Sequence, residues 1–119
     1  MYNIGIDLGG TNIKVGVVDD NFKIVGKSNI KTDLPRPAEE IADSIAKGVE
    51  LACKEAGITV ADINSIGIGT PGVADRNTGV VLYSCNLGFN NTDLGGLLKA
   101  RLGTDVFVEN DANVAAYGE

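Results

Sequence analysis

The amino-acid sequence predicts an α/β fold in which helices pack on a mixed β-sheet. Three short apolar strands come first, and the links between them are too short for parallel crossovers, so they should form an antiparallel meander. Helix, strand, helix and strand follow, and strands joined through crossover helices usually run parallel. The length of 119 residues and the hydrophobic content of 44% suit one compact core, which indicates a single domain.

The meander is predicted from runs of alternating apolar residues at 4–8, 13–18 and 22–26. Turn-forming residues occupy both links, 9–12 and 19–21. A surface loop should follow at 31–37, and then a long helix, because apolar residues recur at three- and four-residue steps between Ile41 and Ala56. Gly57 should end this helix. Gly48 within it lowers helix stability by about 1 kcal/mol relative to alanine. We expect its small size to permit close packing.

Further strands are predicted at 65–69 and 79–82, separated by a loop that contains Pro71 and Gly72. A second helix should begin near Thr92, with Asn91 or Thr92 as its cap and Gly103 as its end. A final strand is predicted at 105–109, and 111–119 is typical of the opening of a third helix. This order of elements suits one half of a ribonuclease-H-like fold, as in actin- and hexokinase-type ATPases, and the chain is expected to stop before that fold is complete.

Composition and charge exclude several functional classes. The formal net charge of -6 argues against a nucleic-acid partner. No apolar run approaches the roughly 18 to 20 residues needed to cross a bilayer, and the first residues lack the pattern of a signal peptide, so we expect a cytoplasmic protein without a membrane partner. Cys53 and Cys85 should be reduced thiols, and zinc is not expected because the two cysteines are too few and too far apart and no histidine is near them.

The link between the first two strands carries a candidate phosphate site. An acidic residue ends the first strand, two glycines make the turn, and hydroxyl, amide and ammonium side chains follow: Asp7, Gly9, Gly10, Thr11, Asn12 and Lys14. Backbone N–H groups of such a turn can approach anionic oxygens, and a carboxylate can hold Mg²⁺ directly or through water. An ordinary Gly-Gly hairpin, in which the polar side chains merely satisfy backbone groups, is the alternative.

Four blocks of the sequence, at 7–14, 67–75, 86–89 and 109–113, together resemble the ROK family of sugar kinases and repressors (repressor, open reading frame, kinase). The resemblance implies that residues 1–119 form the N-terminal lobe of a hexose kinase, most simply one that converts glucose to glucose 6-phosphate. It implies ATP and Mg²⁺ as cofactors, with ATP bound at the six residues of the turn region above. Asp7 is the implied Mg²⁺ ligand, directly or through water.

The same resemblance assigns the sugar side. Asp111 becomes the catalytic base, and the implied sugar-binding residues are Gly69, Thr70, Pro71, Gly72, Asn86, Asn110 and Asp111. From the residues themselves, Asn110 and Asp111 could equally cap the following helix. The Pro-Gly loop could be a structural turn, and Asn86 an ordinary loop amide.

Other family features are missing from this sequence: a Glu-x-Gly-His sugar motif, a zinc cluster and a second glycine-rich region. We therefore expect the chain by itself to be inactive and free of zinc, and the full-length protein to form a homodimer in the manner of many relatives. The alternative function is the sugar-sensing domain of a ROK-type transcriptional repressor. Such repressors carry an N-terminal helix-turn-helix, whereas here the first predicted strand begins near residue 4. An actin-like or chaperone-like ATPase is a third possibility.

Overall fold

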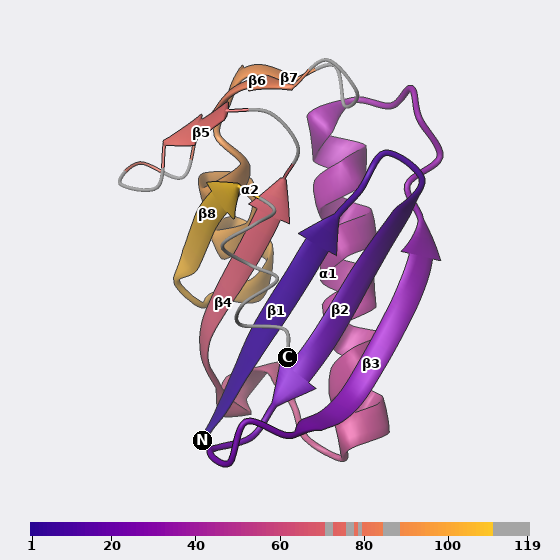
Figure 1. Ribbon diagram of the computed structural model, residues 1–119, viewed down its shortest axis with the longest axis vertical. Coiled ribbons are helices and arrows are strands. Elements are labelled where there is room, and N and C mark those ends of the chain that lie inside the picture. Colours follow the sequence, from indigo (N-terminus) through magenta and orange to yellow (C-terminus); the bar gives the residue numbers. More distant parts are fainter. Residues whose placement is uncertain (71–72, 76–77, 79, 85–88, 111–119) are drawn as a thin grey trace.

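A computed structural model describes residues 1–70, 73–75, 78, 80–84 and 89–110 (Figure 1). Its strands and helices are, in chain order, β1 (Tyr2–Leu8), β2 (Asn12–Val18), β3 (Ile24–Lys31), α1 (Ala38–Ala56), the 3₁₀-helix η1 (Val60–Asp62), β4 (Ile63–Thr70), β5 (Val73–Asp75), β6 (Val80–Ser84), β7 (Phe89–Thr92), α2 (Leu94–Leu102) and β8 (Val106–Asn110).

The main sheet has five strands in the order β3-β2-β1-β4-β8. Strands β1, β2 and β3 pair antiparallel, whereas β4 and β8 continue the sheet parallel to β1. The arrowheads of β1, β4 and β8 accordingly point to the same end of the molecule (Figure 1). The predicted α/β class, the meander and the mixed sheet are thereby confirmed.

Helices α1 and α2 cover one face of this sheet, and the core lies between them and the strands (Figure 1). Helix α1 contributes its apolar stripe, which includes the fully buried Ile41, Ile45 and Val49. Gly57 ends α1 in the left-handed conformation with φ 75°, as predicted. Gly48 is also close-packed, because a Cβ there would lie 3.2 Å from a methyl carbon of Val15.

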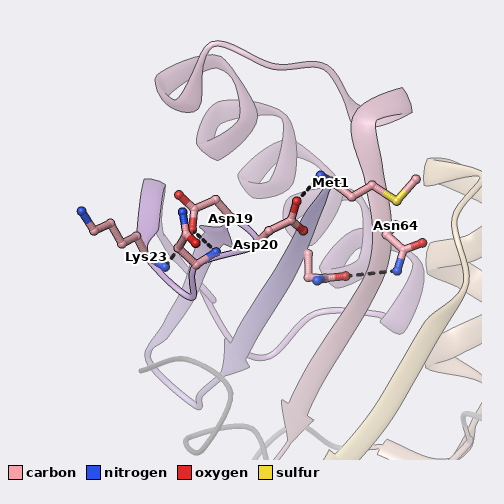
Figure 2. Close-up of polar contacts among 7 residues, drawn as sticks. Met1, Asp19, Asp20, Lys23 and Asn64 are labelled. Atoms are coloured by element: carbon pink, nitrogen blue, oxygen red, sulfur yellow. Dashed lines mark hydrogen bonds and ion pairs between the residues drawn. The ribbon is translucent and has the colours of Figure 1, made fainter.

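The third strand begins later than predicted. Phe22 has a φ of 62° and is 79% exposed, so it belongs to the preceding turn and cannot extend the strand. The Asp19 carboxylate organises this turn by accepting hydrogen bonds from the backbone N–H groups of Asn21 (2.9 Å) and Lys23 (3.0 Å). Figure 2 shows Asp19 and Lys23 together with Asp20, whose carboxylate pairs with the amino terminus of Met1 at 2.9 Å.

The second helix also begins later than predicted. Thr92 lies in β7, and Asp93 caps α2 through a hydrogen bond that its carboxylate accepts from the N–H of Gly96 (3.0 Å). Asn91 and Thr92 were therefore the wrong candidates for the cap, because strand pairing with β6 occupies this segment. Gly103 ends α2 with a φ of 70°, as predicted. The predicted opening of a third helix at 111–119 lies outside the described residues.

A second sheet was not foreseen as such. Strands β5, β6 and β7 pair antiparallel, and of these only β6 matches a predicted strand, the one at 79–82. Strand β5 contacts β8, and β6 contacts α2. This small sheet consequently sits at the end of the molecule toward which β1, β4 and β8 point (Figure 1).

Candidate functional site

The carboxyl ends of three parallel strands bring separate motifs to one edge of the sheet. In the register of the ladders, Asp7 of β1 lies opposite Gly69 of β4, and Gly69 lies opposite Glu109 of β8. One step further, Thr70 lies opposite Asn110. Loops beyond the carboxyl ends of strands in open α/β sheets commonly bind ligands, which makes this edge the candidate site.

A carboxylate and an ammonium group, of opposite charge, lie on neighbouring strands at this edge. Asp7 lies opposite Lys14 across the β1–β2 ladder, and both side chains are exposed. The neighbours of Asp7, Ile6 and Leu8, are fully buried, so the alternation of a strand places Asp7 on the sheet face away from the helices, and its ladder partner Lys14 shares that face. A carboxylate and an ammonium group on one face can bind a metal ion and an anion side by side.

The turn between β1 and β2 is tight because its backbone closes on itself. The N–H of Gly9 donates to the carbonyl of Asn12 at 2.9 Å. A Cβ on residue 9 would lie only 3.0 Å from that carbonyl oxygen, so the close approach requires glycine there. Within the described part of the chain, no hydrogen bond occupies the N–H groups of Gly10 and Thr11. These two exposed residues present the donors of the turn.

Thr32, just after β3, anchors this turn from inside the protein. Its N–H donates to the carbonyl of Thr11 at 2.9 Å, and its hydroxyl donates to the carbonyl of Gly9 at 2.8 Å. The side chain is fully buried. Sequence reasoning missed Thr32 because 31–37 was interpreted only as a surface loop; a threonine directly after a strand is too common to single out.

Two of the predicted sugar-side residues are described with their surroundings. Gly69 and Thr70 end β4, and both are buried. Asn110 is the last residue of β8, so its backbone lies beside that of Thr70 at the same edge. Pro71, Gly72, Asn86 and Asp111 lie outside the described residues.

Among the residues that the structure describes, no group of three or more His, Cys, Asp or Glu side chains could hold a metal ion. Cys53 is a free thiol, 2% exposed, on the buried face of α1. Burial raises the pKa of this thiol, and the negative charges of Asp62 and Glu50 raise it further.

In the described residues, no helix is long and apolar enough to cross a membrane.

One family model and several known proteins match nearly the whole chain. The model of the ROK family matches residues 3–119. A glucokinase from Streptomyces coelicolor is 39% identical over 117 residues, which cover 98% of this chain and 34% of the glucokinase. A putative xylose repressor from Caldicellulosiruptor sp. is 35% identical, covering 98% of this chain and 29% of the repressor.

The fold has a counterpart among solved structures. The ROK family glucokinase from Streptomyces griseus, crystallised with glucose and AMPPNP, superposes with a TM-score of 0.85 at 37% identity. The match covers 98% of this chain and 35% of that one. This chain thus spans about a third of the length of the curated relatives that it matches.

Proposed function

The chain belongs to the ROK family, and we propose that it supplies the phosphate-binding turn and part of the sugar site of a hexose kinase. The reaction would transfer the γ-phosphoryl group of ATP to a sugar hydroxyl, with glucose as the simplest substrate. The observation that carries this proposal is the register of the sheet, which sets Asp7 beside Gly69 and Gly69 beside Glu109. Similarity to proteins named glucokinase supports the same chemistry.

On the nucleotide side, the turn fits a phosphate group through its open donors. The N–H groups of Gly10 and Thr11 are candidate donors to phosphate oxygens, whereas the N–H of Gly9 is already used within the turn. Gly9 would therefore contribute shape, and Asn12 would contribute the carbonyl that closes the turn. Lys14 would balance phosphate charge.

The exposed carboxylate of Asp7 suits Mg²⁺, which binds proteins through one or two carboxylates and keeps phosphate and water as its other ligands. When bound, the ion would neutralise charge that develops on the transferred phosphoryl group. A three-residue metal cluster is not needed for this mode of binding.

On the sugar side, Asp111 is our candidate for the base that accepts the proton of the attacking hydroxyl. In the sequence it directly follows Asn110, the last residue of β8, and β8 and β4 end at the same edge of the sheet. Asn110, Asn86 and the segment 69–72 are candidates for contacts to the other hydroxyls. Gly69 has no side chain, so any contact that it makes to a sugar must come from its backbone.

We treat residues 1–119 as the N-terminal lobe of a two-lobed kinase, because the relatives are about three times as long as the matched segment. Water-excluding closure would need the second lobe, so the chain by itself should be inactive. The cytoplasmic location and the homodimer expected from the family belong to this proposal for the full-length protein.

The test is sugar-dependent release of ADP from the extended protein, defined as this chain with its natural continuation to the length of its relatives. A panel of hexoses and N-acetylated amino sugars is compared in wild type and in Asp111→Asn. Turnover with one sugar, reduced in Asp111→Asn by about a thousandfold or more, would support the kinase and name its substrate. ATP hydrolysis that is indifferent to every sugar would instead indicate an actin-like ATPase.

A second function has its own supporting observation, the 35% identity to a putative xylose repressor. In that case the same lobe would bind a sugar and shift the state of a regulator. Isothermal titration with the same sugar panel, combined with the assay of ADP release, separates the two, since a sensor binds sugar without turning over ATP.

A further inference from the structure

We propose that Thr32 is a positioning residue that orients the phosphate-binding turn, a role that rests on the proposed function of that turn. Thr32 lies outside all four sequence blocks that resemble the family, yet it contacts the turn at two points. Its hydroxyl binds the carbonyl of Gly9 and its N–H binds the carbonyl of Thr11, on either side of Gly10.

The hydrogen bond to the Gly9 carbonyl sets the orientation of the peptide group between Gly9 and Gly10. In a trans peptide, the carbonyl of one residue and the N–H of the next point in opposite directions. Thr32 draws the Gly9 carbonyl inward, toward a side chain that is fully buried. The N–H of Gly10 belongs to the same peptide group and must point outward. The Thr32 hydroxyl therefore aims the donor that a phosphate would meet.

Arg36 connects Thr32 to helix α1. The guanidinium of Arg36 donates to the Thr32 carbonyl from Nε at 3.0 Å and from Nη2 at 2.7 Å. The same Nη2 donates to the hydroxyl of Ser44 on α1 at 2.9 Å. The turn is thereby tied to the helix that packs on the sheet, which fixes its conformation before any ligand binds.

A Thr32→Val substitution keeps the shape of the side chain and removes the hydroxyl. The Gly9 peptide then loses its anchor and can rotate, so the Gly10 N–H is no longer preoriented. A matched control exists on β3, the strand that precedes Thr32: the hydroxyl of Ser28 donates to the carbonyl of Gly48 on α1 at 2.6 Å, which is also a partly buried side-chain hydrogen bond, but it touches no residue of the β1–β2 turn. Ser28→Ala thus reports the loss of a similar bond away from the site.

The experiment measures steady-state kinetics of the extended protein as wild type, Thr32→Val, Thr32→Ser and Ser28→Ala, varying MgATP and sugar separately. We expect Thr32→Val to raise the KM for MgATP about tenfold, the size typical of one buried hydrogen bond, while the KM for sugar stays within about twofold. Thr32→Ser keeps the donor and should restore most of the affinity for MgATP. Ser28→Ala should leave both KM values near wild type even if it lowers the melting temperature.

Two results would overturn the role of Thr32: an unchanged KM for MgATP in Thr32→Val, or equal changes in Thr32→Val and Ser28→Ala. If the wild type phosphorylates no sugar, the kinase proposal fails and hydrogen exchange of the Gly10 amide decides about Thr32. Mg-AMPPNP should then slow that exchange in wild type and in Thr32→Ser but not in Thr32→Val. Absence of protection in the wild type would refute the inference as well.

Discussion

Asp7 on β1 lies directly opposite Gly69 on β4, although the two residues belong to motifs far apart in the sequence. Residues opposite each other in a ladder share a face of the sheet, so the space beside the Asp7 carboxylate is bordered by a residue without a side chain. Lys14 borders it on the other side. The register thus places one exposed carboxylate and one exposed ammonium group opposite each other on this face, next to a residue without a side chain.

Asp7→Asn removes the proposed Mg²⁺ ligand and keeps the size of the side chain. We expect kcat of the extended protein to fall about a hundredfold or more. Weaker binding of Mg²⁺ would leave the charge on the transferred phosphoryl group less completely neutralised. Stability should change by less than about 0.5 kcal/mol, since the side chain is exposed. Steady-state kinetics and urea unfolding check the two statements.

Asp20→Asn is the matched control for that substitution. Asp20 is also an exposed carboxylate, but it lies at the opposite end of the sheet, where it pairs with the amino terminus (Figure 2). An exposed pair of this kind contributes little to stability. Equal losses of activity in Asp7→Asn and Asp20→Asn would refute a specific role for Asp7.

Gly26→Ala should destabilise the fold by about 1–3 kcal/mol, because β3 and α1 approach too closely for a methyl group. A Cβ at residue 26 would overlap the carbonyl oxygen of Ala52 and lie 2.8 Å from the Cβ of Ala56. Gly16→Ala is the control, since its nearest neighbour is a methyl carbon of Ile24 at 3.9 Å, an ordinary contact. Urea unfolding of the chain should rank the two variants in this order, and similar losses in both would contradict the packing argument.

Cys53 should make stability depend on alkaline pH. Its folded pKa is raised, so the unfolded thiol, with a pKa of about 8.5, loses its proton at a lower pH than the folded one. Its contribution to stability is complete below about pH 8.5 and declines as the pH rises through the folded pKa. The difference in unfolding free energy between wild type and Cys53→Ala should therefore shrink from pH 7 to pH 10. Other titrating groups are common to both proteins, and a constant difference would contradict the prediction.

Local patterns in the sequence were enough to predict most elements. The alternation at 4–8 and 13–18, the helical period from Ile41 to Ala56 and the stops at Gly57 and Gly103 all reappear in the structure. The errors in the predicted helix cap arose where several neighbouring residues could each serve as the cap. Asp93 outcompeted Asn91 and Thr92 as a cap because strand β7 holds those two residues, and only the pairing with β6 reveals that strand.

The sequence by itself determined the strands, the long helix, the glycine turn and the family, because each depends on short-range periodicity or on residue type at fixed spacing. Only the tertiary structure decided that Asp7, Gly69 and Glu109 form one row, since strand register depends on packing of the whole sheet. It also decided that Thr32 anchors the turn, because a hydrogen bond between residues 23 positions apart leaves no periodic trace in the sequence.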